Sequence, residues 1–246
     1  MRAKIDLNCD LGEGAGCDAE LMRSVTSANI ACGAHAGNLE TMIETIELAA
    51  KRRVAVGAHP GFFDLENFGR VERPLAPEEA SRLVLMQIEQ FFEIAGSAMR
   101  HVKLHGALYN QVARTPALAE AVVGDLARLW PELVVFVLAG SVFARVARSR
   151  GLRVAEEVFA DRTYQPDGSL TPRAQPNALI GDPLVASAQV VRLVREGVVR
   201  AVDGTEVALQ ADTVCVHGDG PRAAEFARVL RTELKNAKIT VKTFGT

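Results

Sequence analysis

Cysteine is scarce in this chain. There are four, Cys9, Cys17, Cys32 and Cys215, and no two of them form a C-x-x-C pair. Four thiols scattered in this way do not make a disulfide framework, so we expect them to be reduced. Three lie in apolar, strand-like stretches, where cysteine behaves as a small hydrophobic residue. This excludes a small disulfide-stabilised fold and argues against zinc held by thiolates.

An excess of one charge and long apolar runs are also lacking. Lys and Arg number 28 against 30 Asp and Glu, a formal net charge of -2, which is too balanced for a nucleic-acid-binding surface. No stretch approaches the roughly 20 apolar residues of a membrane span, and residues 1–10 contain no apolar signal core. We therefore expect a cytoplasmic protein with neither nucleic acid nor membrane as a partner.

What the chain does have is the material for one large core, because its 246 residues are 48% hydrophobic, which excludes disorder. Segments of helical periodicity are visible after two good start signals, the N-cap residue Asn38 and the proline at Pro77. Seven runs rich in Val, Ile and Leu have strand length and alternate with the helical segments. These runs are 5–10, 28–32, 54–59, 102–105, 133–139, 154–159 and 213–217.

Strands that alternate with helices imply parallel pairing, because each return to the sheet needs a crossover of a dozen or more residues. No linker interrupts the chain, so we predict one domain over residues 1–246. Two architectures fit these elements: a closed barrel and an open doubly wound sheet.

The positions of polar residues favour the barrel. Asp6, Asn8 and Asp10 share one face of the first strand, and Lys103 and His105 share one face of the fourth. In an open sheet both faces lie under helices, where such charges are costly. In a barrel that face is the lumen, and its C-terminal mouth meets water. We predict an α/β fold, a distorted (β/α) barrel of about seven parallel strands, with the open sheet as the alternative.

The stretch 161–182 breaks the alternation. It holds Pro166, Pro172 and Pro176, and a turn signal at 167–168. A loop of this length is typical of a lid or a binding loop, and this one leaves the end of the sixth strand, on the side where barrel enzymes keep their chemistry.

Titratable residues gather at the same side. Four of the five histidines and several other polar residues fall at or just past the C-terminal ends of predicted strands, as is typical of a barrel active site. His101 falls at the start of its strand, so we expect it to be structural. The set at the strand ends is His35, His59, His105, His217, Asn8, Asp10, Lys103, Asp161 and Asp219.

Two kinds of chemistry are open to this set. Asp10, His59 and His105 could supply ligands to a divalent metal, although no H-E-x-x-H motif is present. Without a metal the same groups could act as acid and base, or simply form a polar cluster. Lys103 would neutralise a carboxylate or hold an anionic substrate. The glycines at 12, 14 and 16 and the 218–221 turn are only weak signals for phosphate.

Several motifs together resemble the LamB/YcsF family along essentially the whole chain. Two departures are Leu104, where the family's Pro is expected, and Asn177, where Gly is expected; neither removes a candidate catalytic group. Tyr164 and the 167–168 turn also match. The motifs are DLNCDLGEG at 6–14, ANIACGAHAG at 28–37, VGAHPGF at 56–62, VKLHGALYN at 102–110, EVFADR at 157–162 and VHGDG at 216–220.

The resemblance implies a seven-stranded barrel related to the glycoside hydrolase and deacetylase fold. It also implies the ATP-dependent opening of the lactam 5-oxo-L-proline to L-glutamate, together with two partner subunits. Since no Walker motif is present, the nucleotide site could lie mainly in a partner. The residues inside matching motifs that we carry over as catalytic are Asp10, His59, His105 and His217, and those carried over as substrate-binding are Asn8, His35, Lys103, Asp161 and Arg162.

As hypotheses, Lys103 or Arg162 holds the substrate carboxylate, Asp10 with His59 or His105 activates water, and His217 protonates the departing nitrogen. Two other functions stay open. One is a metal-dependent carbohydrate deacetylase, which the same barrel and the same residues could support. The other is a non-catalytic subunit that binds the substrate.

Overall fold

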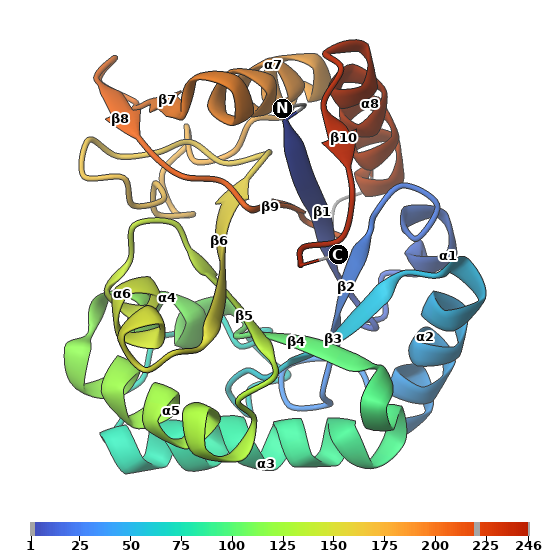
Figure 1. Cartoon of the computed structure of the whole chain (residues 1–246), viewed down its shortest axis with the longest axis vertical. Helices are drawn as coiled ribbons and strands as arrows, with labels where there is room; N and C mark the ends of the chain where they lie inside the picture. The colour runs from blue at the N-terminus through green and yellow to red at the C-terminus, as the bar shows by residue number, and fades with distance from the viewer. Residues whose placement is uncertain (1–2, 219–221, 246) are drawn as a thin grey trace.

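Seven parallel strands close into a barrel in the computed structural model, which describes residues 3–218 and 222–245 (Figure 1). Each of the seven predicted runs overlaps a strand, and β9 pairs back onto β1, which rules out the open sheet. The fourth strand begins at Met99 and ends at Lys103, so His101 lies in its middle and not at its start. Around the barrel the strand order is β1 (Lys4–Leu11), β2 (Ser27–Ala31), β3 (Ala55–His59), β4 (Met99–Lys103), β5 (Val134–Leu138), β6 (Arg153–Phe159) and β9 (Thr213–Val216).

Helices surround the barrel as an outer ring (Figure 1). The two predicted start signals are confirmed. Asn38 caps α2 by accepting from the Thr41 amide, and Pro77 is the first residue of α3. The helices are α1 (Asp18–Leu21), α2 (Leu39–Arg52), α3 (Pro77–Ala95), the 3-10 turn η1 (Gly96–Ala98), α4 (Gly106–Arg114), α5 (Pro116–Leu129), α6 (Val142–Ser149), α7 (Pro183–Glu196) and α8 (Ala223–Asn236).

Three short strands were not predicted. β10 (Thr240–Val241) pairs with the beginning of β1, and β7 (Val198–Arg200) forms an antiparallel hairpin with β8 (Glu206–Ala208). Each has only two or three residues, so none produces a readable alternation of polar and apolar side chains.

The two faces of the barrel wall bury different kinds of side chain, apolar on the outside and polar on the inside. On β1 the outward residues Ile5, Leu7 and Cys9 are buried against the helix layer. The inward residues of the same strand, Asp6 and Asn8, are equally buried but polar. The apolar core therefore lies between barrel and helices, and the middle of the lumen is filled by hydrogen-bonded polar side chains, as the phase of the first strand indicated.

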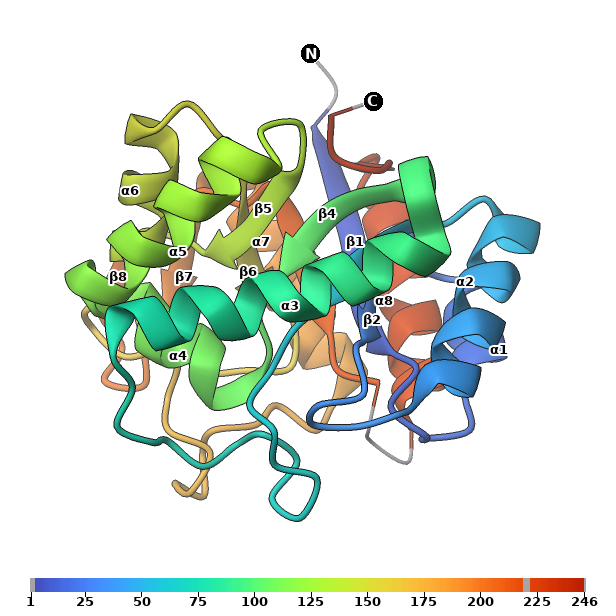
Figure 2. The ribbon, with the colours of Figure 1, turned by 90° about the horizontal axis from the view of Figure 1, so that it is seen from below.

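A small apolar cluster closes the lumen near the N-terminal ends of the strands. Val134, Phe136 and Ala155 form it, and Phe244 from the C-terminal segment packs against them. His101 stacks on Phe136 with ring centroids 4.2 Å apart. The lumen is therefore accessible from one end, the C-terminal mouth. Figure 2 shows the long loops projecting from that end and the two termini at the other.

The long loop is confirmed. Residues 161–182 contain no helix or strand, and two isolated bridges, Arg162 with Leu179 and Tyr164 with Leu170, tie the loop to itself. All four cysteines are free thiols. Within the described ranges, no helix combines the length and the apolar character that crossing a bilayer needs.

Candidate active site

A cleft of about 820 Å³ opens at the C-terminal mouth of the barrel. Its walls come from the ends of β1, β3, β4 and β6, from the segment after β3 and from the loop 161–182. Six of the nine carried-over site residues line it. They are Asp10, His59, Lys103, His105, Arg162 and His217.

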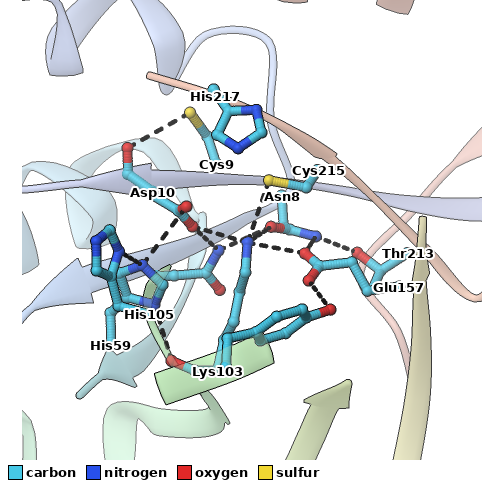
Figure 3. Close-up of polar contacts among 12 residues, drawn as sticks. Asn8, Cys9, Asp10, His59, Lys103, His105, Glu157, Thr213, Cys215 and His217 are labelled. Atoms are coloured by element: carbon cyan, nitrogen blue, oxygen red, sulfur yellow. Dashed lines mark hydrogen bonds and ion pairs between the residues drawn. The ribbon is translucent and has the colours of Figure 1, made fainter. Parts of the chain in front are cut away.

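Lys103 lines this cleft. Its side chain lies between two carboxylates, those of Asp10 and Glu157 (Figure 3). Its Nζ is 2.8 Å from Asp10 Oδ1 and 2.8 Å from Glu157 Oε1. It also donates to Asn8 Oδ1 at 3.3 Å and to Cys215 Sγ at 3.1 Å. Cys215 is therefore a polar partner inside the lumen rather than the small hydrophobic residue that its surroundings in the sequence indicated.

Lys103 and the carboxylates beside it stabilise one another's charged forms. Burial alone would lower the pKa of the Lys103 ammonium, but Asp10, Cys215 and Glu157 together raise that pKa well above its usual value. Burial would likewise raise the pKa of Asp10, yet His59 and Lys103 hold it well below the ordinary range. Lys103 is thus a buried cation already shared by two carboxylates. It neutralises these acids, one of the two roles considered, and has little charge left for an anionic substrate.

Glu157 is a functional candidate that the sequence analysis did not select. Its carboxylate is fully buried, accepts from Asn8 Nδ2 at 2.9 Å, and accepts from the Tyr109 hydroxyl at 2.8 Å. Burial and the neighbouring Glu157 raise the pKa of Tyr109 well above its usual value. A signal was available, since Glu157 opens the EVFADR motif and stands inside a run whose other residues are mostly apolar.

Asn29 was also missed. Its side-chain amide donates to Asp10 Oδ1 at 2.8 Å and to Asn8 Oδ1 at 2.7 Å. Its own Oδ1 accepts from His101 Nε2 at 2.9 Å, which fixes the orientation of the amide. The structural role expected for His101 is therefore to aim Asn29 at Asp10.

Three histidines and one glutamate form a second cluster at the edge of the cleft. His59 Nε2 and His105 Nδ1 are 2.9 Å apart, and Glu13 Oε1 lies 3.1 Å from His35 Nε2. The donor atoms of these four residues all lie within 4.8 Å of one another, so together they could hold a metal ion. Glu13 and His35 here accompany the two histidines expected in a metal group, whereas Asp10 Oδ2 lies 3.5 Å from His59 Nε2.

Burial disfavours the charged form of two of these imidazoles, His35 and His105. Burial and the neighbouring His59 lower the pKa of His35 to about 3. The pKa of His105 is also well below its usual value, because of burial and then His59 and His35. Glu13 was overlooked because it belongs to no strand; it lies just beyond β1, in the DLGEG turn.

A carboxylate and an imidazole form a pair on the opposite wall. His217 Nδ1 donates to both oxygens of Asp161, at 2.8 and 2.7 Å. Burial would raise the pKa of Asp161, but the charge and hydrogen bond of His217 outweigh it, so that pKa is lowered. This contact leaves Nε2 as the nitrogen available for proton transfer, the arrangement of an oriented acid or base.

Arg162 anchors the loop beside this pair. Its Nε donates to the Ala178 carbonyl at 3.3 Å and one terminal nitrogen donates to the Thr171 carbonyl at 2.5 Å. Burial lowers the pKa of the guanidinium to about 10, so it keeps its charge at neutral pH. Among the described residues, no carboxylate oxygen lies within the 4.0 Å of a salt bridge to it, which leaves a cation facing the cleft.

The other carried-over residues lie just outside the cleft wall. Asn8 and His35 are buried behind it, each in contact with a residue that lines it, and Asp161 supports His217. All nine therefore meet around one mouth. The candidate Asp219 and the rest of the 218–221 turn after Gly218 lie outside the described residues.

Comparison with known proteins covers nearly the whole chain. The model of the LamB/YcsF family matches residues 5–246. A protein of Oceanobacillus iheyensis, named as the A subunit of 5-oxoprolinase, is 48% identical over 98% of this chain and 97% of its own length. A protein of the same name from Bordetella pertussis is also 48% identical, over 98% of this chain and 99% of its own length.

Solved structures agree with the fold. A lactam utilization protein from Thermus thermophilus superposes with a TM-score of 0.90 at 43% identity, covering 98% of this chain and all of the other. A T48 deacetylase superposes with a TM-score of 0.50 at 13% identity, covering 98% of this chain and 87% of the other, which shows a shared fold alone. The barrel related to deacetylases is therefore confirmed, and the chain belongs to the LamB/YcsF family.

Proposed function

We propose that this chain is the A subunit of an ATP-dependent 5-oxoprolinase and carries the site at which the lactam amide is opened to L-glutamate. The observation that carries the proposal is the match along nearly the full length to relatives with that subunit's name. The cleft supports it, because acid, base and cation are present together there. We also propose that two further subunits complete the enzyme, since the relatives are named as one subunit of it.

ATP is needed for a chemical reason. A five-membered lactam is an unstrained amide, and its carbon is a poor electrophile. Transfer of the terminal phosphoryl group of ATP to the lactam oxygen makes that carbon reactive and provides a phosphate leaving group. We assign the binding of ATP mainly to a partner, because this sequence contains no Walker motif.

The cleft offers a place for each part of the activated lactam. Arg162 is the cation suited to the carboxylate on the ring, since Lys103 is already shared by Asp10 and Glu157. The cavity of about 820 Å³ exceeds what a single lactam fills, which leaves room for a phosphoryl group.

The base and the acid for the proton transfers lie on opposite walls of the cleft. Asp10, whose pKa is held low, is ionised and takes a proton from water, helped by His59 or His105. That water forms a new carbon–oxygen bond as the carbon–nitrogen bond breaks, which leaves γ-glutamyl phosphate. A second water then displaces the phosphate and gives L-glutamate. His217 gives its Nε2 proton to the departing ring nitrogen, and Asp161 stabilises the charged imidazole before transfer.

Reconstitution tests this proposal. The chain is mixed with the two partner subunits, 5-oxo-L-proline and ATP, and glutamate and ADP are measured while each component is omitted in turn. We expect both products only from the complete mixture. Asp10→Asn should abolish glutamate formation with an unchanged circular dichroism spectrum, whereas Asp203→Asn, on an exposed turn, should leave turnover intact. Near-normal turnover by the Asp10 variant contradicts the assignment.

Two outcomes would favour the other functions. Release of acetate from N-acetyl sugars without ATP or partners would identify a deacetylase, a reading supported by the cluster of Glu13 and three histidines. Full activity after His105→Gln would identify a subunit that binds the substrate without catalysing its hydrolysis, because a binding subunit has no need of this imidazole.

A further inference from the structure

The imidazole rings of His59 and His105 in the cleft each have one ring nitrogen that faces the other ring. His59 Nδ1 lies 2.8 Å from the backbone carbonyl of Lys103, and His105 Nε2 lies 2.9 Å from the carbonyl of Phe68. A carbonyl only accepts, so each of these nitrogens carries a hydrogen, and a ring without a second proton has its lone pair on the opposite nitrogen. The opposite nitrogens, His59 Nε2 and His105 Nδ1, then carry lone pairs, and they are 2.9 Å apart.

Two lone pairs at this distance repel unless a positive centre lies between or beside them. That centre is either a shared proton or a metal ion. A ring that donates its one N–H to a backbone carbonyl is the usual state of a histidine that binds a metal through its other nitrogen, because this contact fixes the tautomer and the direction of the lone pair. Both rings have that contact.

A carboxylate oxygen completes the group. Glu13 Oε1 lies 3.5 Å from His105 Nδ1 and 3.9 Å from His59 Nε2. Nitrogen and oxygen ligands about 2.0 to 2.1 Å from a tetrahedral ion lie roughly 3.3 Å from one another. The three separations, 2.9, 3.5 and 3.9 Å, bracket that value, so one ion reaches all three atoms after small side-chain shifts.

His35 has a different part in this cluster. Its ring lies flat on that of His105, with centroids 3.7 Å apart and planes 3° apart. An ion in the plane of one ring therefore lies outside the plane of the other. His35 Nε2 is 3.1 Å from Glu13 Oε1, which makes it a donor that orients this carboxylate.

Glycines make this packing possible. A Cβ at Gly61 would lie 2.7 Å from His35 Nδ1, and one at Gly69 would lie 2.8 Å from His35 Cβ. A side chain at either position would overlap His35 and force it to shift. The close fit supports a positioning role for His35.

We propose that His59 Nε2, His105 Nδ1 and Glu13 Oε1 bind one divalent transition-metal ion, with His35 holding Glu13 in place. Two imidazoles and one carboxylate are a ligand set typical of catalytic zinc and of non-haem iron(II), which leave a coordination position open. Asp10 Oδ2, 3.5 Å from His59 Nε2, lies next to the group. When bound, such an ion polarises a carbonyl or makes water more acidic, and it then replaces His59 and His105 in assisting Asp10, because their lone pairs are used to bind it. The site stands on side-chain geometry and does not depend on which amide the enzyme opens.

Metal binding by the full chain tests the site without substrate or partners. The purified chain is stripped with a chelator, loaded with Zn²⁺ or Co²⁺, and passed through a desalting column. We expect about one ion per chain by elemental analysis, an absorption band of bound Co²⁺ in the visible region, and a higher melting temperature. His59→Gln and Glu13→Gln should each weaken binding by more than about 100-fold, and His35→Gln by about 10- to 100-fold.

A matched control separates this site from adventitious binding. His217 lines the same cleft but is held by Asp161, so His217→Gln should bind the ion as the unaltered chain does. Equal affinity in His59→Gln and the unaltered chain would place the ion elsewhere and overturn the proposal. Absence of binding by the unaltered chain would also overturn it and would leave a shared proton between the two imidazoles. Circular dichroism of each variant shows whether lost binding reflects lost folding.

Discussion

Lys103 donates from Nζ to Asp10 Oδ1 at 2.8 Å, and neither side chain is more than a tenth exposed. The same nitrogen reaches Glu157, so one ammonium separates two carboxylates inside the barrel. Such a group is stable only while complete, because each charge has been taken out of water and has only its partners to replace it.

Lys103→Met should destabilise the protein strongly. The variant leaves Asp10 and Glu157 without their shared cation, and removing one partner of a buried pair costs about 3 to 5 kcal/mol. Unfolding in urea, followed by circular dichroism, measures the change. Because one carboxylate of the variant must take up a proton, part of the lost stability should return at low pH.

An exposed ion pair is the control for that result. Arg150 and Glu120 lie 3.1 Å apart with about half of each side chain exposed, so Arg150→Met should cost less than about 1 kcal/mol. A loss in the Lys103 variant no larger than this would show that water reaches the lumen and replaces the ammonium.

The barrel could be predicted from the sequence, because the evidence for it is the alternation of polar and apolar residues within individual strands. Asp6, Asn8 and Asp10 fall on one face of β1, and that face is the lumen. The mouth followed from the same phase, since Lys103 on β4 and His105 just past it point to the same side. Site residues from strands far apart in the sequence were thus predicted to lie together without any knowledge of distances.

What could not be predicted depends on contacts across the barrel. Whether Lys103 binds a substrate or neutralises acids is decided by Glu157, which lies two strands away. Glu13 and His35 join the histidine cluster through loop geometry, which has no periodicity to read. The strand β10 is too short for a pattern, and its pairing with β1 comes from opposite ends of the chain.

Asp161→Asn should slow catalysis and change its pH dependence. The amide can still contact His217 Nδ1 but no longer stabilises a charged imidazole. In the reconstituted enzyme, kcat should fall by about 100-fold or more, and the alkaline limb of kcat/KM should move to lower pH. An unchanged pH profile would show that this pair takes no part in proton transfer.

Arg162→Met should weaken substrate binding more than turnover. If the guanidinium binds the ring carboxylate, KM for 5-oxo-L-proline should rise by about 10- to 100-fold, the value of a charged hydrogen bond. The carboxamide analogue of the substrate lacks that charge, so its KM should be nearly the same for the variant and the unaltered enzyme. A comparable increase for both substrates would instead indicate that the variant has displaced the loop 161–182, since Arg162 also donates to Thr171 and Ala178.

Acid should destabilise the protein through buried histidines. Burial, then the charge of Lys103, lowers the pKa of His101 to about 3, and burial lowers that of His35 to about 3 as well. In the unfolded chain both titrate near the ordinary value of about 6.5. Between these values the unfolded chain holds more protons than the folded chain, so the free energy of unfolding decreases as the pH falls below about 6.5.

His101→Gln isolates one of these protons. Its amide can still donate to Asn29, but it does not titrate, so the slope of unfolding free energy against pH between about 5 and 6 should decrease by about one proton, or about 1.4 kcal/mol per pH unit. Urea unfolding at each pH, with a chelator present to keep the cleft free of metal, provides that slope. At pH 8 the His101 ring is neutral in both the folded and the unfolded chain. The difference in unfolding free energy between the two proteins at that pH therefore measures the packing cost of the substitution, which can be subtracted. An identical slope for the two proteins would mean that His101 is protonated in the folded chain, and its contact with Asn29 would then have to survive next to a charged ring.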